Sequence, residues 1–180
     1  MAAQPNRGKG LIREWAETIV TALILALIIR AFVIQVFYIP SGSMEPTLEI
    51  GDRIIVNKFI YRFSAPKRFD IIVFEYPYTK AGEKKKDYIK RIIGLPDETL
   101  EVRDGDVFIN GVKLNEKHMM SKDMSGFSKF KVPFDSYFMM GDNRGNSADS
   151  RVWGYMPKKF IKGPAVFRIW PLNRFGLIAQ

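Results

Sequence analysis

A continuous apolar segment near the N-terminus is the strongest constraint on what this chain can fold into. Residues 18–39 carry a single formal charge, that of Arg30. As a helix the segment would be about 33 Å long, enough to cross a hydrocarbon core of about 30 Å. We therefore predict a membrane anchor over residues 18–39, preceded by a tail over residues 1–17 and followed by a separate domain over residues 40–180.

Other interpretations of this segment stay open. A buried core helix is usually shorter. A cleavable signal peptide has an apolar region of about 7–15 residues, although Ser41-Gly42-Ser43 resembles its small-x-small cleavage site. An arginine at the depth of Arg30 costs about 2.5–3.5 kcal/mol. Either its side chain reaches the membrane interface, or the span is displaced and residues 31–39 lie partly outside it.

Basic residues are distributed unevenly around the segment. Arg7, Lys9 and Arg13 precede it, and no lysine or arginine follows it before Arg53. The positive-inside rule then places the N-terminus in the cytoplasm and residues 40–180 on the extracytoplasmic side.

Composition excludes several classes of chemistry. The chain has no cysteine and one histidine, His118, which lies in a polar stretch, so thiolate and multi-histidine sites are excluded. The formal charge is +9, but no nucleic-acid-binding motif accompanies it, and we predict no nucleic-acid partner. The polar run at residues 140–151 lacks the terminal glutamate of a calcium loop. We predict neither a metal nor a cofactor.

Beyond residue 50 the pattern changes to short β-branched runs separated by turn residues, which favours an all-β domain. Asp104-Gly105 and Asn110-Gly111 suit hairpin turns that need positive φ. We predict a mainly β, antiparallel, barrel-like ectodomain with one N-terminal transmembrane helix, and an exposed loop over residues 115–131. The expected strands cover residues 53–57, 70–74, 88–93, 100–102, 107–109, 112–114, 137–140 and 165–170.

A hydroxyl-bearing turn, Ser41-Gly42-Ser43-Met44-Glu45-Pro46-Thr47, follows the apolar segment almost directly. Serine is a weak nucleophile without a neighbouring base, and no acidic partner stands beside His118. Lys90 is the best-placed lysine, because Tyr88 and Ile92 share its face in a strand. It can act as a base only if burial lowers its pKa from about 10.4 to about 7–8. The alternative is an edge-strand lysine whose amine reaches water.

Three segments follow the apolar run in order: Pro40-Ser41-Gly42-Ser43-Met44-x-Pro46-Thr47, then Asp87-Tyr88-Ile89-Lys90-Arg91, then Gly141-Asp142-Asn143-Arg144 through Ser147-x-Asp149-Ser150-Arg151. This combination resembles bacterial type I signal peptidases, and the match extends to Arg168-Ile169-Trp170-Pro171. The resemblance implies a mostly antiparallel β domain on one or two membrane helices. It also implies a serine endopeptidase of the bacterial inner membrane that removes signal peptides from secretory preproteins after small-x-small sites, with membrane lipid as its surroundings.

The resemblance also assigns roles to residues. Ser43 is the nucleophile and Lys90 the general base. Ser41 joins the Ser43 backbone N–H in an oxyanion hole, and Ser147 orients Lys90. Further implied residues are Asp142 and Arg144 in shaping the third segment, Asp149 with Arg151 as a supporting ion pair, and Ile39, Met44, Tyr88 and Ile89 as the lining of shallow substrate pockets.

Two positions depart from the family pattern: Gly145 stands where the family often has Asp, and Asp97 where it commonly has Gly. Neither touches the expected serine–lysine pair. Two other functions remain as alternatives. One is a repressor-type Ser/Lys autoprotease, although the apolar segment occupies the place of its DNA-binding domain. The other is a non-catalytic, membrane-tethered β module that binds acidic partners.

Overall fold

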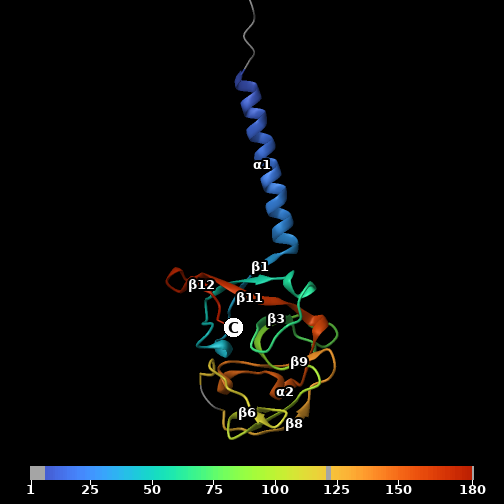
Figure 1. Ribbon diagram of the computed structural model, residues 1–180. Coiled ribbons are helices and arrows are strands. Elements are labelled where there is room, and N and C mark those ends of the chain that lie inside the picture. The colour runs from blue at the N-terminus through green and yellow to red at the C-terminus, as the bar shows by residue number, and fades with distance from the viewer. Residues whose placement is uncertain (1–6, 121–122, 180) are drawn as a thin grey trace, which may run out of the picture.

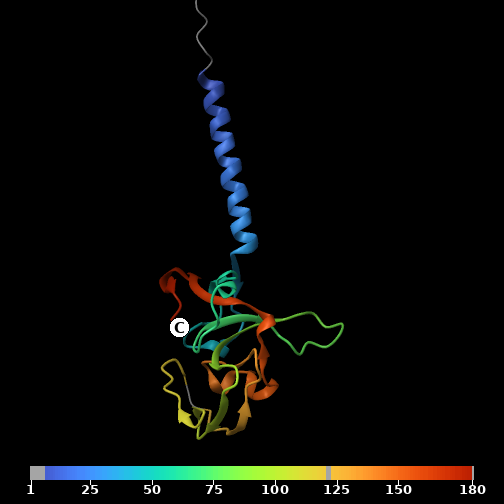
Figure 2. The same cartoon turned by 45° about the vertical axis from the view of Figure 1, so that its right-hand side comes forward.

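The computed structural model describes residues 7–120 and 123–179, and the side chains of residues 7–12 and 28–32 lie outside that description. A long helix, α1 (Arg7–Phe32), leads into a body made almost entirely of strands. Figures 1 and 2 show this helix projecting away from the body, which hangs from its C-terminal end.

The helix ends earlier than the apolar segment does. Phe32 is its last residue, and β1 (Ile34–Tyr38) pairs antiparallel with β2 (Arg53–Asn57), so the prediction of one helix through residue 39 is wrong. The β-branched and aromatic residues of β1 bond to a neighbouring strand instead of continuing the helix. Among the described residues, no helix meets the combined length and apolarity needed to cross a membrane. Residues 1–6 and the side chain of Arg30, to which the two predicted membrane depths apply, lie outside the described part of the chain.

The larger sheet contains eight strands, all paired antiparallel. Its order is β1-β2-β11-β3-β4-β9-β10, with β12 added to β11. Strand β4 therefore has a neighbour on each side, and β2 and β11 lie between the helix junction and the rest of the body. The strands not yet named are β3 (Ile71–Glu75), β4 (Asp87–Gly94), β9 (Ser136–Met140), β10 (Met156–Pro157), β11 (Ile161–Trp170) and β12 (Gly176–Leu177).

The smaller sheet has the order β7-β6-β5-β8 and lies at the end of the body far from the helix (Figure 1). Its two tight turns are those predicted: Asp104, Gly105, Asn110 and Gly111 have φ values of 51°, 75°, 51° and 83°. The sheet consists of β5 (Thr99–Arg103), β6 (Asp106–Ile109), β7 (Val112–Lys113) and β8 (Phe127–Lys131).

The predicted mainly β, antiparallel class is confirmed, and a strand lies over each expected range. The described strands form two open sheets and not one closed barrel. Strand β8 falls within the expected loop 115–131, because Phe127 and Phe130 pack on the core beside β5. The short helices are α2 (Ser150–Trp153) and the 3₁₀ turns η1 (Gly42–Met44), η2 (Ile60–Arg62), η3 (Arg144–Asn146), η4 (Lys158–Phe160) and η5 (Leu172–Arg174).

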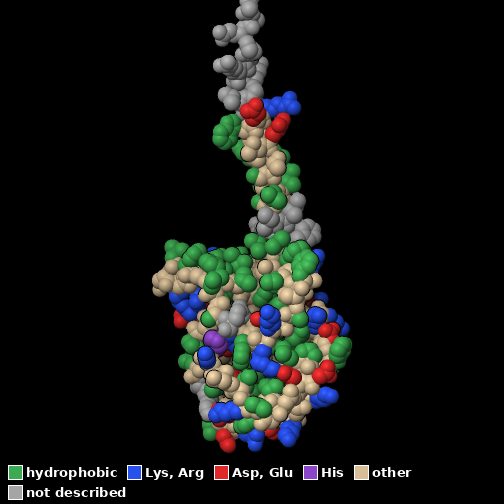
Figure 3. Space-filling view, viewed as in Figure 1, with side chains coloured by type: hydrophobic (Ala, Val, Ile, Leu, Met, Phe, Trp, Pro, Cys, Tyr) green, Lys and Arg blue, Asp and Glu red, His purple; other side chains and the backbone are tan. Residues whose placement is uncertain are grey.

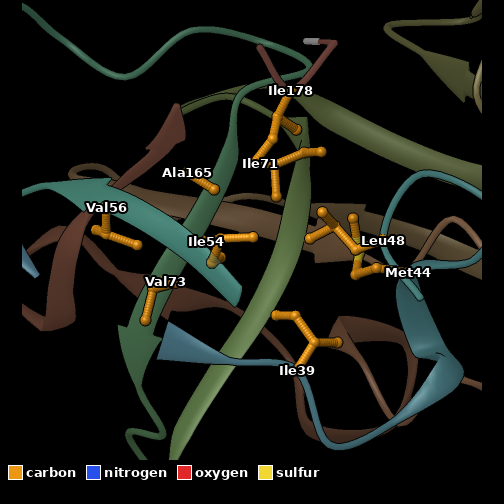
Figure 4. Packing of buried hydrophobic residues seen from close by; sticks show 9 residues of the cluster. All are labelled: Ile39, Met44, Leu48, Ile54, Val56, Ile71, Val73, Ala165 and Ile178. Carbon is orange, nitrogen blue, oxygen red and sulfur yellow. The ribbon is translucent and has the colours of Figure 1, made fainter. Parts of the chain in front are cut away.

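The core cluster nearest the helix anchors the serine turn. Met44 and Leu48, on either side of the turn's proline, are fully buried against side chains of β2, β3 and β11 (Figure 4). Complete burial of such side chains stabilises the fold by about 1.5–3 kcal/mol each. The turn is therefore fixed by the core, although it is a loop in sequence.

A glycine on β11 is required by close strand packing. Gly163 has φ +153°, and a Cβ at this position would lie 2.1 Å from the Asn57 carbonyl oxygen on β2. We expect Gly163→Ala to lower the free energy of unfolding by about 1–3 kcal/mol through overpacking, measured by chemical denaturation of the full chain. Gly145→Ala is the control, since a Cβ there meets nothing within 4 Å. Equal stability of the two variants would contradict this account.

Candidate active site

The serine turn presents one hydroxyl at the edge of the core. Ser43 is the central residue of η1 and is 7% exposed, whereas Ser41 at the N-cap is exposed. The Asn143 side chain donates to the Gly42 carbonyl over 3.2 Å and so joins this turn to the third motif segment. The backbone on which the Ser43 hydroxyl stands is therefore fixed both by the core and by the third motif segment.

Lys90 reaches this hydroxyl from β4. Its Nζ lies 2.7 Å from Ser43 Oγ and 3.0 Å from the Ile89 carbonyl oxygen. The side chain is 5% exposed, and β4 lies between β3 and β9. The alternative of an edge-strand lysine reaching water is therefore wrong. The predicted face is also observed, because the Tyr88 ring centroid lies 5.8 Å from Nζ.

Burial is the main influence on the charge of Lys90. Desolvation lowers its pKa from 10.5 to about 8, while Asp149 and Asp142 act in the opposite direction by stabilising the ammonium form. With this pKa, about one tenth of the amine is neutral at pH 7 and about half at pH 8. A buried neutral amine within hydrogen-bond distance of a hydroxyl can accept its proton.

The third segment packs directly on the backbone of the serine turn. A Cβ on Gly141 would lie 2.4 Å from the Ser43 carbonyl oxygen and 2.3 Å from Ser147 Oγ. The Asn143 backbone N–H also donates to the Ser43 carbonyl over 3.2 Å. Only glycine fits at position 141 without displacing one of these partners.

Ser147 does not make the hydrogen bond expected of it. Its Oγ is buried and has no hydrogen-bond partner among the described residues. The polar contacts of the Lys90 amine are with Ser43 and Ile89. An unpaired buried hydroxyl costs about 1–3 kcal/mol. The Ser147 hydroxyl beside Gly141 is therefore a polar group that can still accept or donate a hydrogen bond. Its role in orienting Lys90 stays a prediction.

A buried ion pair joins the three motif segments. Arg91 donates to both carboxylate oxygens of Asp142 over 2.8 and 2.7 Å, and Thr47 Oγ1 donates to the same carboxylate over 2.6 Å. The Arg91 side chain is 2% exposed and also donates to the Phe69 carbonyl over 2.8 Å. The sequence does not predict a role for Arg91, because a charged residue on the same strand face as Ile89 and Ile93 does not reveal its partner.

Two further arginines hold the third segment. The predicted pair between Asp149 and Arg151 is formed, with Nε 2.9 Å from Oδ1, and Asp149 also accepts from the Gly141 N–H over 3.0 Å. Arg144 pairs with Glu116. Glu116 belongs to the expected loop 115–131, whose polar composition gave no sign of a buried partner.

A cleft of about 320 Å³ opens at the Ser43–Lys90 pair. It includes the predicted residues Ser41, Tyr88 and Ile89. Ile39 and Met44 are buried in the core behind the turn (Figure 4), and their contribution to a substrate pocket stays a prediction. The cleft is lined by Pro40, Ser41, Ser43, Asp87, Tyr88, Ile89, Lys90, Asn146 and Ala148.

The arrangement suits acyl transfer by a serine activated by a neutral lysine. It combines a nucleophile and base at 2.7 Å with a cleft open to a substrate segment. Within the described ranges, no group of three or more acidic or histidine side chains is placed to hold a metal ion.

Comparison with known proteins points to the same chemistry. A family model described as "Signal peptidase, peptidase S26" matches residues 12–170, a range that includes all three motif segments. Signal peptidase I of Leptolyngbya laminosa is 47% identical over 179 residues, covering 97% of this chain and 87% of the relative. Probable signal peptidase I-2 of Synechocystis sp. is 45% identical, with coverage of 93% and 77%. Signal peptidase I P of Bacillus subtilis subsp. natto is 38% identical, with coverage of 97% of each chain.

The pKa of Lys90 can be measured directly. We expect its amine, observed by NMR in lysine-labelled protein, to titrate near the value of about 8 that burial imposes. The neutral fraction should rise from about one tenth at pH 7 to about nine tenths at pH 9. Lys90→Met identifies the signal by removing it. A midpoint above pH 10 for this resonance would show that the amine is not desolvated.

Proposed function

Because the chain belongs to the peptidase S26 family and is a signal peptidase I, a serine endopeptidase that removes signal peptides, we propose that Ser43 is its nucleophile and Lys90 its general base. The observation that carries this proposal is the 2.7 Å contact between Ser43 Oγ and the buried Lys90 amine.

In the first half of the reaction, Ser43 Oγ attacks the scissile carbonyl carbon while neutral Lys90 accepts the hydroxyl proton. The resulting oxyanion is stabilised by the Ser43 backbone N–H and the Ser41 hydroxyl. Loss of one such donor typically costs about 10²–10³ in rate. Lys90, now an ammonium, passes its proton to the leaving amine as the peptide bond breaks, and an acyl-enzyme remains on Ser43.

In the second half, Lys90 is again neutral and accepts a proton from water as the water attacks the acyl carbon. The ester bond to Ser43 breaks, and the proton returns to its Oγ. Burial supports this cycle because it keeps the amine readily deprotonated. Ser147 is available to bond the amine in either state, since its hydroxyl has no other partner among the described residues.

The substrates that we propose are secretory preproteins cut after small-x-small sites. The supporting feature is a cleft of about 320 Å³, which Tyr88 and Ile89 line beside the nucleophile. Side chains of this bulk leave room for small residues and exclude large ones. Ile39 and Met44 support the pocket floor from the core behind the serine turn.

The serine–lysine pair can be tested by substitution. We expect Ser43→Ala and Lys90→Ala each to lower cleavage of a preprotein to background, while circular dichroism shows a folded chain. Matched controls are Ser128→Ala and Lys129→Ala, two exposed positions on β8 that should keep full activity. Substantial activity in either active-site variant would refute the pair.

Signal peptidases I are membrane enzymes, and we propose that this chain is a single-pass protein of the bacterial cell membrane, anchored through the apolar part of residues 18–39. Support comes from Arg7, Lys9 and Arg13 before the segment and from the absence of lysine and arginine after it until Arg53. The N-terminus is then cytoplasmic, and residues 40–180 are extracytoplasmic. Membrane lipid and preproteins are the partners in this proposal, which includes no nucleic acid.

Exposed apolar side chains near the helix junction support contact between this end of the body and the membrane. Figure 3 shows hydrophobic side chains gathered over the part of the body closest to the helix. Apolar patches of this kind are typical of membrane or protein contact sites. The exposed large apolar side chains of β1, of the loop after the serine turn, of the end of β11 and of the segment from η5 to β12 include Val36, Tyr38, Ile50, Trp170, Leu172, Phe175 and Leu177.

Because the chain contains no cysteine, its topology can be mapped with single introduced thiols. In intact spheroplasts we expect a membrane-impermeant maleimide to label Ser128→Cys but not Ala3→Cys. After detergent permeabilisation both variants should be labelled, and the parent chain should stay unlabelled throughout. Labelling of Ala3→Cys before permeabilisation, or recovery of the full chain without detergent, would contradict the proposed anchor.

A further inference from the structure

The segment between β7 and β8 contacts the loop at residues 141–151, which carries Gly141 and Ser147. Glu116 pairs with Arg144, and the Met120 backbone N–H donates to the Asp142 carbonyl over 3.0 Å. Asp123 lies 2.6 Å from Arg151. One segment therefore meets the active-site loop at three points.

The contact between Glu116 and Arg144 is the most buried of the three. The two side chains are 7% and 4% exposed, and both Glu116 carboxylate oxygens accept from the guanidinium. Bidentate pairing fixes the orientation of an arginine as well as its position. Replacing one partner leaves the other as an uncompensated buried charge.

Arg144, whose orientation Glu116 fixes, in turn contacts the backbone beside the reacting groups. Its Nε donates to the Gly141 carbonyl over 3.0 Å. A Cβ on Gly141 would lie 2.4 Å from the Ser43 carbonyl oxygen and 2.3 Å from Ser147 Oγ, so the Gly141 backbone packs directly against both groups. A change in the Arg144 orientation would therefore move the surface against which the serine turn rests.

The second arginine strengthens the same connection. Arg151 donates to Asp123 and, over 2.7 Å, to the carbonyl of Arg144. It also holds Asp149, which accepts from the Gly141 N–H. The Gly141 carbonyl is thus bound by Arg144, which pairs with Glu116. The Gly141 N–H is bound by Asp149, whose partner Arg151 pairs with Asp123.

From these contacts we propose that Glu116 is a positioning residue for peptide-bond cleavage, which acts through Arg144 and Gly141 to hold Ser43 at bonding distance from Lys90. The inference rests on the proposed Ser43–Lys90 pair. A positioning role differs from a purely structural one in one respect. The loss of Glu116 lowers the rate per folded molecule and not only the amount of folded protein.

The test compares Glu116→Gln, Glu116→Asp and Glu101→Gln in the full-length, detergent-solubilised chain. Glu101 pairs with Arg103, whose side chain is 57% exposed, and serves as the matched control for loss of one carboxylate. We expect Glu116→Gln to lower kcat for a preprotein on the order of 10-fold, with KM within about twofold, because misplacement acts on the transition state. Glu116→Asp should recover part of the loss, and Glu101→Gln should match the parent.

Rates are expressed per folded molecule, with the folded fraction measured by tryptophan fluorescence. A kcat for Glu116→Gln within twofold of the parent overturns the inference, even if that variant unfolds at a lower temperature. An equal loss in Glu101→Gln also overturns it. If Glu116→Gln does not fold, Glu116→Asp decides: a lowered kcat per folded molecule supports the inference and an unchanged kcat overturns it.

Ser43→Ala separates this inference from the function on which it rests. An inactive Ser43→Ala together with a fully active Glu116→Gln refutes only the positioning role. An active Ser43→Ala refutes the serine–lysine pair, and the positioning role with it.

Discussion

The rest of this site depends on the desolvation of the Lys90 amine. An exposed lysine is a cation at neutral pH and cannot take a proton from serine. Here the amine lies on an interior strand, 5% exposed, and burial brings its pKa to about 8. The sheet must therefore supply a neighbour on each side of β4, and the serine turn must close the remaining side.

Two arginine–aspartate ion pairs help burial to lower the pKa of Lys90. Asp142 and Asp149 both favour the charged form of Lys90, and each is bound by its own guanidinium, from Arg91 and Arg151. Each pair offsets the negative charge that would otherwise hold a proton on the amine. The same pairs fix the loop that contacts Ser43, so geometry and electrostatics are maintained by the same side chains.

Much of the fold could be predicted because it depends on local chemistry. The turns at Asp104-Gly105 and Asn110-Gly111 adopt the positive φ that their sequence favours, and the short β-branched runs are strands. Strand β1 could not be separated from the helix, since apolar content alone does not distinguish a helix continuing from a strand pairing with β2. The contact between Glu116 and Arg144 joins residues 28 positions apart, and nothing in the sequence around either one predicts it. The motifs around Ser43 and Lys90 are specific enough to identify both residues. No sequence pattern indicates that the Ser147 hydroxyl has no hydrogen-bond partner in the described part of the chain.

The short connection between α1 and β1 has a consequence for how a cutting position is chosen. One residue, Val33, separates the helix from the strand, and β1 continues over five residues toward the serine turn. A strand of that length extends about 17 Å. If α1 is held in a bilayer, the length of β1 limits how far the serine turn can lie from the lipid. Preproteins inserted in the same bilayer would then be selected by the distance between their scissile bond and the end of their own apolar segment. This selection would not depend on the side chains around that bond.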